Sequence, residues 1–345
     1  MDMTFEILKG DTPGLEWRFP VLRFRPEGLA SGPKVYMQAG LHAGELPGPG
    51  TLHVLAAHLR QAKADGRLRS EITLVPRANP IGLNQDLFGT LHGRFDLATR
   101  TNFNRDFPLP DKPVPPHRAL SAVSRLKARL LELVFGADIV LDLHCDDVSL
   151  QYVYVPAVLW PGMRDLAQAL DCAAALLWGD GSDGAFEEAA LAPLLTLPPA
   201  ELATKVVSTV ELRGLADVGA DLAEKDAAGL MRFLEGRGAL AGPWRSDDTW
   251  SGLAVPLENI EMIRAPVGGA VWFDVEPGSV VGAGQRLARI LHAPGEENGA
   301  TEVHAPQAGT IITRVSQQLV RPGGDLMKVA CAAPSNNYRP GALES

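Results

Sequence analysis

Helix-like and strand-like patterns alternate over the first 240 residues of this 345-residue chain, and beyond them only strand-like patterns occur. Apolar residues at helical spacing, as in residues 51–59, lie between short β-branched runs, as in residues 71–76. This alternation is typical of an α/β domain, in which helices cover a central sheet. We therefore predict an α/β domain over residues 1–240, a linker over residues 241–261 and an all-β domain over residues 262–345.

The expected elements follow from the period of the apolar residues and from the Gly and Pro residues that interrupt them. Strands are predicted over residues 4–8, 16–25, 34–39, 71–76, 138–145, 151–156 and 205–214. Helices are predicted over residues 51–59, 117–135, 163–177 and 221–234.

The C-terminal part of the chain contains an internal repeat. Residues 265–290 recur loosely at residues 305–330, so that Val280 matches Val320 at an offset of 40 residues. Each copy reads as a strand-turn-strand unit with one apolar face, and two such units bury that face by packing on one another.

Charge and composition exclude several classes of protein. A net charge of −9 argues against nucleic acid, which is held mainly by lysine and arginine. No apolar run approaches the roughly 20 residues of a membrane span, and the N-terminus has no secretory pattern. The three cysteines are scattered, which indicates a reducing compartment without a disulfide framework. We expect a cytoplasmic protein that binds neither nucleic acid nor membrane.

Two histidines and a glutamate stand where ligands bind in α/β proteins. His42 and Glu45 lie in the turn after the strand predicted over residues 34–39, and the carboxyl end of such a strand is a common binding position. An imidazole and a carboxylate three residues apart can bind one cation, although this spacing alone is more often a chance pairing or a surface turn. His144 shares one face of its predicted strand with Asp142, and a hydrogen-bonded core histidine is the alternative there.

Other candidate residues are a glutamate and a group of arginines. Glu211 lies near the carboxyl end of the strand predicted over residues 205–214, where a buried carboxylate requires a partner or a role. The irregular segment 91–110 contains Arg94, Arg100 and Arg105, which can bind a carboxylate through paired guanidinium hydrogen bonds. Salt bridges in a solvated loop are the alternative, and we favour it for Arg100.

The order of these motifs resembles that of the succinylglutamate desuccinylase and aspartoacylase family, a branch of the zinc carboxypeptidase-like fold. The matching motifs are His42-x-x-Glu45, Asn79-Pro80-x-Gly82, Asn104-Arg105, Asp142-Leu143-His144 and Thr209-Val210-Glu211-Leu212-Arg213. The resemblance implies an α/β hydrolase domain with a mixed sheet. The C-terminal repeat resembles the barrel-sandwich module of biotinyl and lipoyl carrier domains.

The resemblance also implies a role for each candidate residue. His42, Glu45 and His144 would bind one Zn²⁺ per chain, and Glu211 would act on a zinc-bound water as general base and later as acid. Asn104 and Arg105 would hold a substrate carboxylate. Arg94 would polarise the scissile carbonyl. The implied function is hydrolysis of the amide bond of an N-acyl amino acid or a related small amide.

Two departures from the expected patterns leave alternatives open. No tyrosine occurs between Tyr154 and Tyr338, whereas carboxypeptidases of this fold place one upstream of the glutamate. The hairpin between the two repeats, residues 291–301, lacks the lysine that carrier modules modify, and Lys328 lies elsewhere. We expect no biotin or lipoate, and a structural module that forms homo-oligomers or shapes the site entrance.

Three other functions remain open at this point. They are a metallocarboxypeptidase acting on peptides, a non-catalytic scaffold, and a thiol hydrolase using Cys145. Strand alternation disfavours the last, because it points Cys145 away from the face that carries His144. The acyl group and the amine of the substrate are not specified by any motif.

Overall fold

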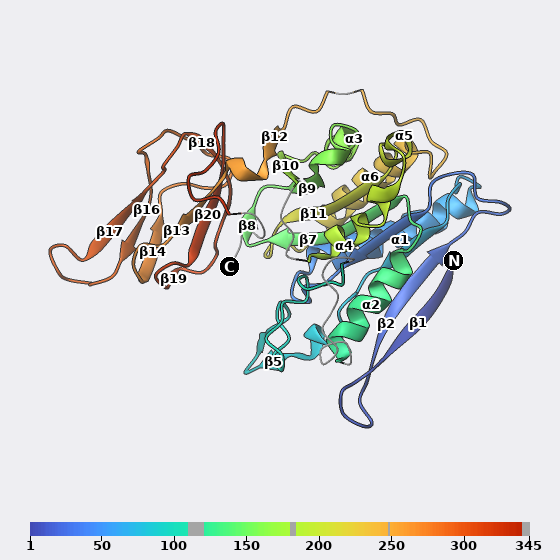
Figure 1. Ribbon diagram of the computed structural model, residues 1–345, viewed down its shortest axis with the longest axis horizontal. Helices are drawn as coiled ribbons and strands as arrows, with labels where there is room; N and C mark the ends of the chain where they lie inside the picture. Colours follow the sequence, from blue (N-terminus) through green and yellow to red (C-terminus); the bar gives the residue numbers. More distant parts are fainter. Residues whose placement is uncertain (110–120, 180–183, 248, 340–345) are drawn as a thin grey trace.

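A nine-stranded mixed sheet forms the centre of the first part of the chain (Figure 1). The computed structural model describes residues 1–109, 121–179, 184–247 and 249–339. In order across the sheet, the strands are β1 (Asp2–Lys9), β2 (Glu16–Phe24), β4 (Ile72–Val75), β3 (Val35–Ala39), β7 (Ile139–Asp146), β11 (Val206–Gly214), β9 (Tyr152–Pro156), β10 (Ala174–Trp178) and β12 (Leu253–Pro256).

The middle of this sheet is parallel and buried on both faces. Strands β4, β3, β7 and β11 run in the same direction, and β9 is antiparallel to β11. All five residues of β3 and the first seven of β7 are buried, which explains their continuous apolar sequences. The parallel direction brings the carboxyl ends of β3, β7 and β11 to one edge of the sheet.

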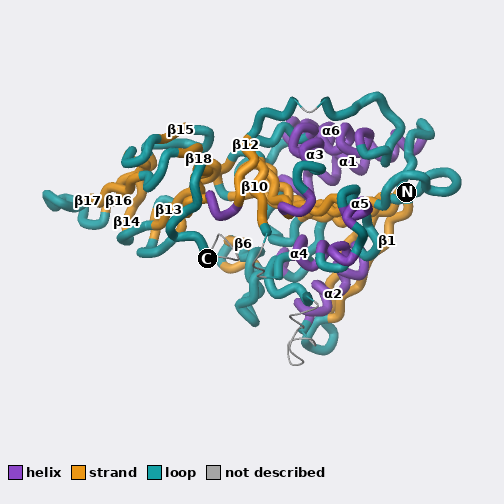
Figure 2. Tube along the Cα trace, turned by 45° about the horizontal axis from the view of Figure 1, so that its top comes forward, coloured by secondary structure: helices purple, strands orange, loops and turns teal. Residues whose placement is uncertain are grey.

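Helices cover both faces of the sheet. Figure 2 shows α1 (Pro47–Ala64), α3 (Arg164–Ala169) and α6 (Ala220–Gly236) on one face, and α2 (Ala122–Val134) and α4 (Phe186–Leu191) on the other. The short helix α5 (Pro199–Leu202) precedes β11. The α2 helix begins after Ser121, whose hydroxyl accepts a hydrogen bond from the Ser124 amide. Residues 117–120 of the predicted helix lie outside the described residues.

The helix predicted over residues 163–177 is correct in its first part and wrong in its second. Helix α3 ends at Ala169, Asp171 adopts a left-handed backbone conformation, and Ala174–Trp178 forms the strand β10. An alanine- and leucine-rich run suits either state, and here pairing with β9 and β12 determines the outcome. Strand β12, within the stretch predicted as a linker, therefore joins the main sheet.

Residues 260–331 form two antiparallel sheets, which we call the β module. One sheet contains β13 (Ile260–Arg264), β20 (Asp325–Cys331), β18 (Gly309–Arg314) and β15 (Val280–Val281). The other contains β17 (Ala300–His304), β16 (Arg286–Leu291), β14 (Gly269–Phe273) and β19 (Leu319–Val320). Each repeat gives its short strand to the other copy's sheet, since β15 pairs with β18 and β19 pairs with β14. This exchange confirms that the repeats pack together.

The β module is joined to the main sheet by strand pairing and by an apolar cluster. Strand β8 (Val148–Ser149), just after β7, pairs with β18, and the Leu150 amide donates to the Ile312 carbonyl at 3.1 Å. Ile312 and Ala330 of the module share a buried cluster with Tyr152 and Leu176 of the main sheet. The module is thereby fixed beside the ends of β7 and β9.

Short elements complete the described structure. Strands β5 (Asp86–Leu87) and β6 (Thr90–Leu91) form a small hairpin. Single 3₁₀ turns cover Gly82–Asn84, Ala157–Leu159, Leu194–Thr196 and Leu257–Asn259. Within the described ranges, every helix is too short or too polar to cross a bilayer.

Candidate metal centre

The candidate residues meet at the carboxyl edge of the parallel strands. His42 and Glu45 lie in the turn after β3, and His144 lies near the end of β7, the neighbouring strand. Glu211 stands directly opposite His144 on β11. The sheet thus brings together four side chains that are up to 169 residues apart in sequence.

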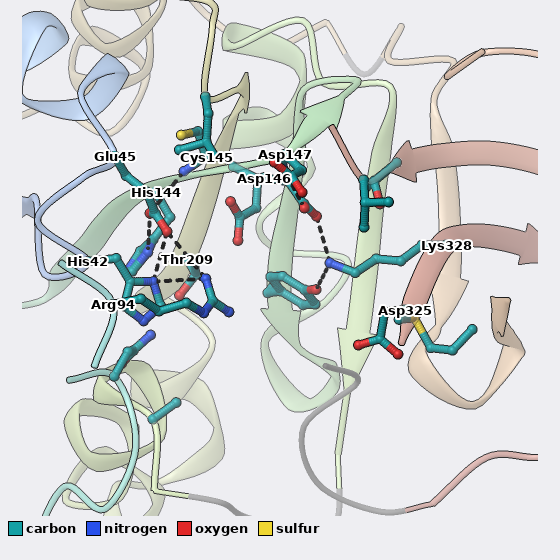
Figure 3. Close-up of a pocket in the computed structure, with 18 of the residues that line it drawn as sticks. His42, Glu45, Arg94, His144, Cys145, Asp146, Asp147, Thr209, Asp325 and Lys328 are labelled. Atoms are coloured by element: carbon teal, nitrogen blue, oxygen red, sulfur yellow. Dashed lines mark hydrogen bonds and ion pairs between the residues drawn. The ribbon is translucent and has the colours of Figure 1, made fainter. Parts of the chain in front are cut away.

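The side chains of His42, Glu45 and His144 point toward one another (Figure 3). The Nδ1 atom of His42 lies 2.8 Å from Glu45 Oε1, and the Nδ1 atom of His144 lies 2.8 Å from Glu45 Oε2. One ligand atom from each residue falls within a span of 4.8 Å, and all three residues are buried. This arrangement could hold a metal ion between two imidazoles and a carboxylate.

Both imidazoles are also held from the side facing away from this centre. Asn102 Oδ1 lies 2.9 Å from His42 Nε2. Asp142 Oδ2 lies 3.0 Å from His144 Nε2, in an ion-pair contact that lacks the alignment of a hydrogen bond. Such outer partners orient imidazoles that bind metals, and they fix Nδ1 as the nitrogen that faces the centre.

Electrostatics favour positive charge at this position. Burial alone would raise the pKa of Glu45, but the neighbouring imidazoles of His42 and His144 hold that pKa below its usual range. Burial opposes protonation of His144, yet Asp142 and Glu45 raise its pKa well above the usual value. Burial lowers the pKa of His42. The buried carboxylates of Glu45 and Asp142 therefore attract a cation, and a bound metal ion would provide that positive charge.

Glu211 is a partly buried residue next to this group, and one of its two carboxylate oxygens is buried. Its Oε2 atom has no hydrogen-bond partner among the described residues, and burial raises its pKa well above the usual range. The backbone changes course just after it, because Arg213 is left-handed and the β11–β7 register shifts before Gly214. Arg213 is held there by Asp226 of α6, with one contact at 3.0 Å. The motif's arginine thus anchors the strand end that carries Glu211.

Arg94 comes from a loop that packs on the metal-site turn. Its Nη1 atom lies 3.4 Å from His42 Nδ1 and 3.5 Å from Glu45 Oε1. The preceding residue, Gly93, permits this approach, since a Cβ atom there would lie 2.7 Å from the Gly44 nitrogen. The Arg94 side chain is 41% exposed, so its guanidinium is open to the pocket as well as to the site.

Asn104 and Arg105 line the same pocket, but the side chain of Asn104 mainly stabilises the fold. Its side-chain oxygen accepts a hydrogen bond from the Phe186 amide at 2.8 Å. Arg105 Nη1 donates to the Asn104 carbonyl at 2.7 Å. The buried ammonium of Lys127 donates to the carbonyls of Asn102 and Arg105, which fastens this turn to α2.

Asn79 of the Asn-Pro-x-Gly motif ties two loops together. Its side-chain oxygen accepts from the Gly82 amide, and its side-chain nitrogen donates to the Leu41 carbonyl, both at 2.8 Å. The motif is a turn that supports the residue before His42.

The pocket itself has a volume of about 530 Å³ and extends from the candidate metal centre to the β module. Sequence reasoning missed several polar residues in or beside it, among them Asn102 behind His42, Glu187 of α4, and Arg314 and Lys328 of the β module. Burial raises the pKa of Glu187 to about 7, and no described residue pairs with its Oε2 atom. The module residues follow no local motif, so only the folded chain reveals them.

Cys145 lines the pocket but is poorly suited to act as a nucleophile. Burial raises the pKa of its thiol far above the usual range, and its backbone amide donates to Glu45 Oε2 at 3.3 Å. We predict that Cys145→Ala changes turnover by less than about threefold, because a thiol that stays protonated gives no thiolate. Steady-state kinetics test this, and loss of most turnover would instead favour a thiol mechanism.

Comparison with known proteins finds a matching family and solved structures with the same fold. Residues 31–237 match the model of the succinylglutamate desuccinylase/aspartoacylase catalytic domain. A family protein of that description from Shewanella amazonensis is 27% identical, with a TM-score of 0.83, and the match covers 96% of this chain and 99% of the other. A comparison with curated proteins finds no match.

Two further solved structures share the fold at lower identity. A succinylglutamate desuccinylase/aspartoacylase from Shewanella frigidimarina is 24% identical, with a TM-score of 0.83 and coverage of 97% and 99%. The ectoine utilization protein EutE from Ruegeria pomeroyi is 19% identical, with a TM-score of 0.73 and coverage of 96% and 95%. These likenesses extend over both the main sheet and the β module.

Proposed function

Because the chain belongs to the succinylglutamate desuccinylase/aspartoacylase family, we propose that it is a zinc-dependent hydrolase of N-acyl amino acids or related small amides. The observation that carries this proposal is the meeting of His42, Glu45 and His144 in one pocket with the partly buried carboxylate of Glu211. A scaffold protein would have no use for an unpaired carboxylate at this position, since its burial is costly.

The donor set suits zinc. Two imidazole nitrogens and one carboxylate form a ligand set that catalytic zinc sites use, and a fourth position is then left for water or substrate. The outer contacts from Asn102 and Asp142 are those expected around such imidazoles. When bound, zinc would lower the pKa of a coordinated water and polarise a carbonyl oxygen. We propose one zinc ion per chain.

Glu211 is proposed to carry the proton transfers. As general base, its carboxylate takes a proton from the attacking water, and as general acid it returns that proton to the departing amine. Burial raises the pKa of Glu211, which makes its carboxylate a stronger base for the first of these two transfers. The Oε2 atom of Glu211 has no hydrogen-bond partner among the described residues. We propose that it bonds to the attacking water or to the substrate during the reaction.

The arginines are proposed to act on negative charge. Arg94, beside the metal-binding side chains, would stabilise the oxyanion that develops when the scissile carbonyl is attacked. Arg105 would bind the substrate carboxylate through its guanidinium, and Asn104 would hold the turn that presents it. Each residue then has a separate task in one reaction.

Release of free amine from a panel of acylated substrates tests the substrate class. The panel contains N-acetyl and N-succinyl derivatives of acidic, neutral and basic amino acids, together with unmodified di- and tripeptides. We expect hydrolysis of at least one acyl amino acid and little release from peptides. Hydrolysis of the peptides alone would instead assign the protein as a carboxypeptidase.

A further inference from the structure

Lys328 is a buried charged residue that points out of the β module and into the main domain. On β20, Val329 and Cys331 face the module's core, whereas Lys328 and Ala330 face the opposite way. Lys328 is only 2% exposed. Figure 3 shows its side chain reaching from the module strand toward Asp146, at the end of β7.

The Lys328 ammonium meets three oxygen atoms of the main domain. Its Nζ atom lies 2.6 Å from Asp146 Oδ2, 3.1 Å from the Tyr152 hydroxyl and 3.3 Å from the Tyr154 hydroxyl. An ammonium has three N–H donors, so these partners can use all of them. The Tyr152 hydroxyl also donates to Asp146 Oδ2 at 2.8 Å, which closes a network around the carboxylate.

This network lies next to the proposed catalytic residues but does not contain any of them. Asp146 follows His144 by two residues on β7 and pairs in register with Gly214 of β11. Tyr152 stands opposite Glu211 on β9. Lys328 therefore holds the ends of the two strands that flank Glu211.

Docking of the module does not require a charge here. The apolar cluster that contains Ile312 and Ala330 already joins the two parts. A buried ion pair adds little stability over apolar side chains of similar size, but removal of one partner leaves an uncompensated charge. Docking alone therefore does not explain the buried lysine at this interface. Its ion pair with Asp146 offers another explanation.

We propose that Lys328 is a positioning residue of the active site, which fixes Asp146 and the strand ends on either side of Glu211. The inference rests on the proposed function, since it assigns Lys328 to the same reaction. Without the ammonium, the Asp146 carboxylate is driven toward solvent, and the end of β7 that carries His144 moves with it. The β module is then part of the catalytic unit.

Four variants of the full chain test this role: Lys328→Met, Asp146→Asn, the double variant, and Ile312→Ala as the control for docking. We expect Lys328→Met to lower kcat by about 10- to 100-fold, the loss typical of supporting partners around a site. KM should change much less, because the substrate contacts remain. In the double variant an amide replaces the unpaired carboxylate, so we expect recovery of most of the lost kcat.

The control separates positioning from docking. Ile312 lies on the same interface but does not line the pocket, so Ile312→Ala should lower the unfolding midpoint and leave kcat near that of the parent. Equal losses of kcat in Ile312→Ala and Lys328→Met would overturn the proposal, as would unchanged kcat in Lys328→Met. Failure of the double variant to recover kcat would also contradict it.

Unfolding in denaturant gives a second measurement that does not depend on activity. Coupling between Lys328 and Asp146 makes the effects of the two single variants on unfolding non-additive. A parent protein that hydrolyses nothing in the panel would refute the proposed function. The inference would then be judged by unfolding alone, where additive effects overturn the pairing and non-additive effects uphold it.

Discussion

Glu211→Gln is expected to keep its full metal content and to lose turnover by about 10²- to 10⁴-fold, the usual contribution of a general acid-base group. Glutamine matches the shape of glutamate but cannot accept the water proton. Because Glu211 is not one of the three converging ligands, the metal should remain. Metal analysis and steady-state kinetics on the same sample measure both quantities.

Glu187→Gln is the matched control for this variant. Glu187 also lines the pocket and also has a buried Oε2 atom without a hydrogen-bond partner among the described residues, but it lies on α4 rather than on β11. We expect a much smaller loss of turnover than in Glu211→Gln. A Glu211→Gln protein that is as fast as its parent would show that another group moves the proton.

His144→Ala is expected to lose its metal. The change removes one of three ligands and also leaves Asp142 buried without its cationic neighbour. The loss of affinity should exceed the about 10- to 100-fold that removal of an outer partner costs. Equilibrium dialysis followed by metal analysis gives the occupancy of each variant.

His53→Ala serves as the control for that experiment. His53 is exposed on α1, away from the converging ligands, so its replacement should leave one metal per chain. Full occupancy in His144→Ala would remove His144 from the ligand set. Loss of metal in both variants would indicate general destabilisation instead of loss of a ligand.

Strand period is the reason that much of the site could be predicted from the sequence. The two-residue repeat of β7 places Asp142 and His144 on one face, and the ion-pair contact between them confirms this. Parallel pairing then sets His144 beside Glu211. These relations depend only on local pattern and on the rule that parallel strands end at one edge.

The residues that could not be predicted are those that tertiary packing brings in. Lys328 lies 182 residues beyond Asp146 in sequence, and no spacing rule relates them. Asn102 reaches His42 from an irregular loop whose course no period determines. The second part of the helix predicted over residues 163–177 fails for a related reason, because sheet partners rather than local preference make Ala174–Trp178 a strand.

Arg94 and Arg105 illustrate an intermediate case. Their side-chain chemistry indicated an anion site, but they lie 11 positions apart in an irregular loop, and their relative placement could not be derived. In the structure both line one pocket, with Arg94 close to the metal-binding side chains. The close packing of Gly93 on the turn that carries Gly44 produces this placement.

The most direct test of the central proposal is a zinc titration of the chelator-treated protein, with amine release from the best acyl amino acid measured at each addition. Activity should be absent without metal, rise in proportion to zinc and level off at one ion per chain. Glu211→Gln carried through the same titration should bind the same zinc and stay nearly inactive. Full hydrolysis by the metal-free protein, with zinc adding nothing, would contradict the account.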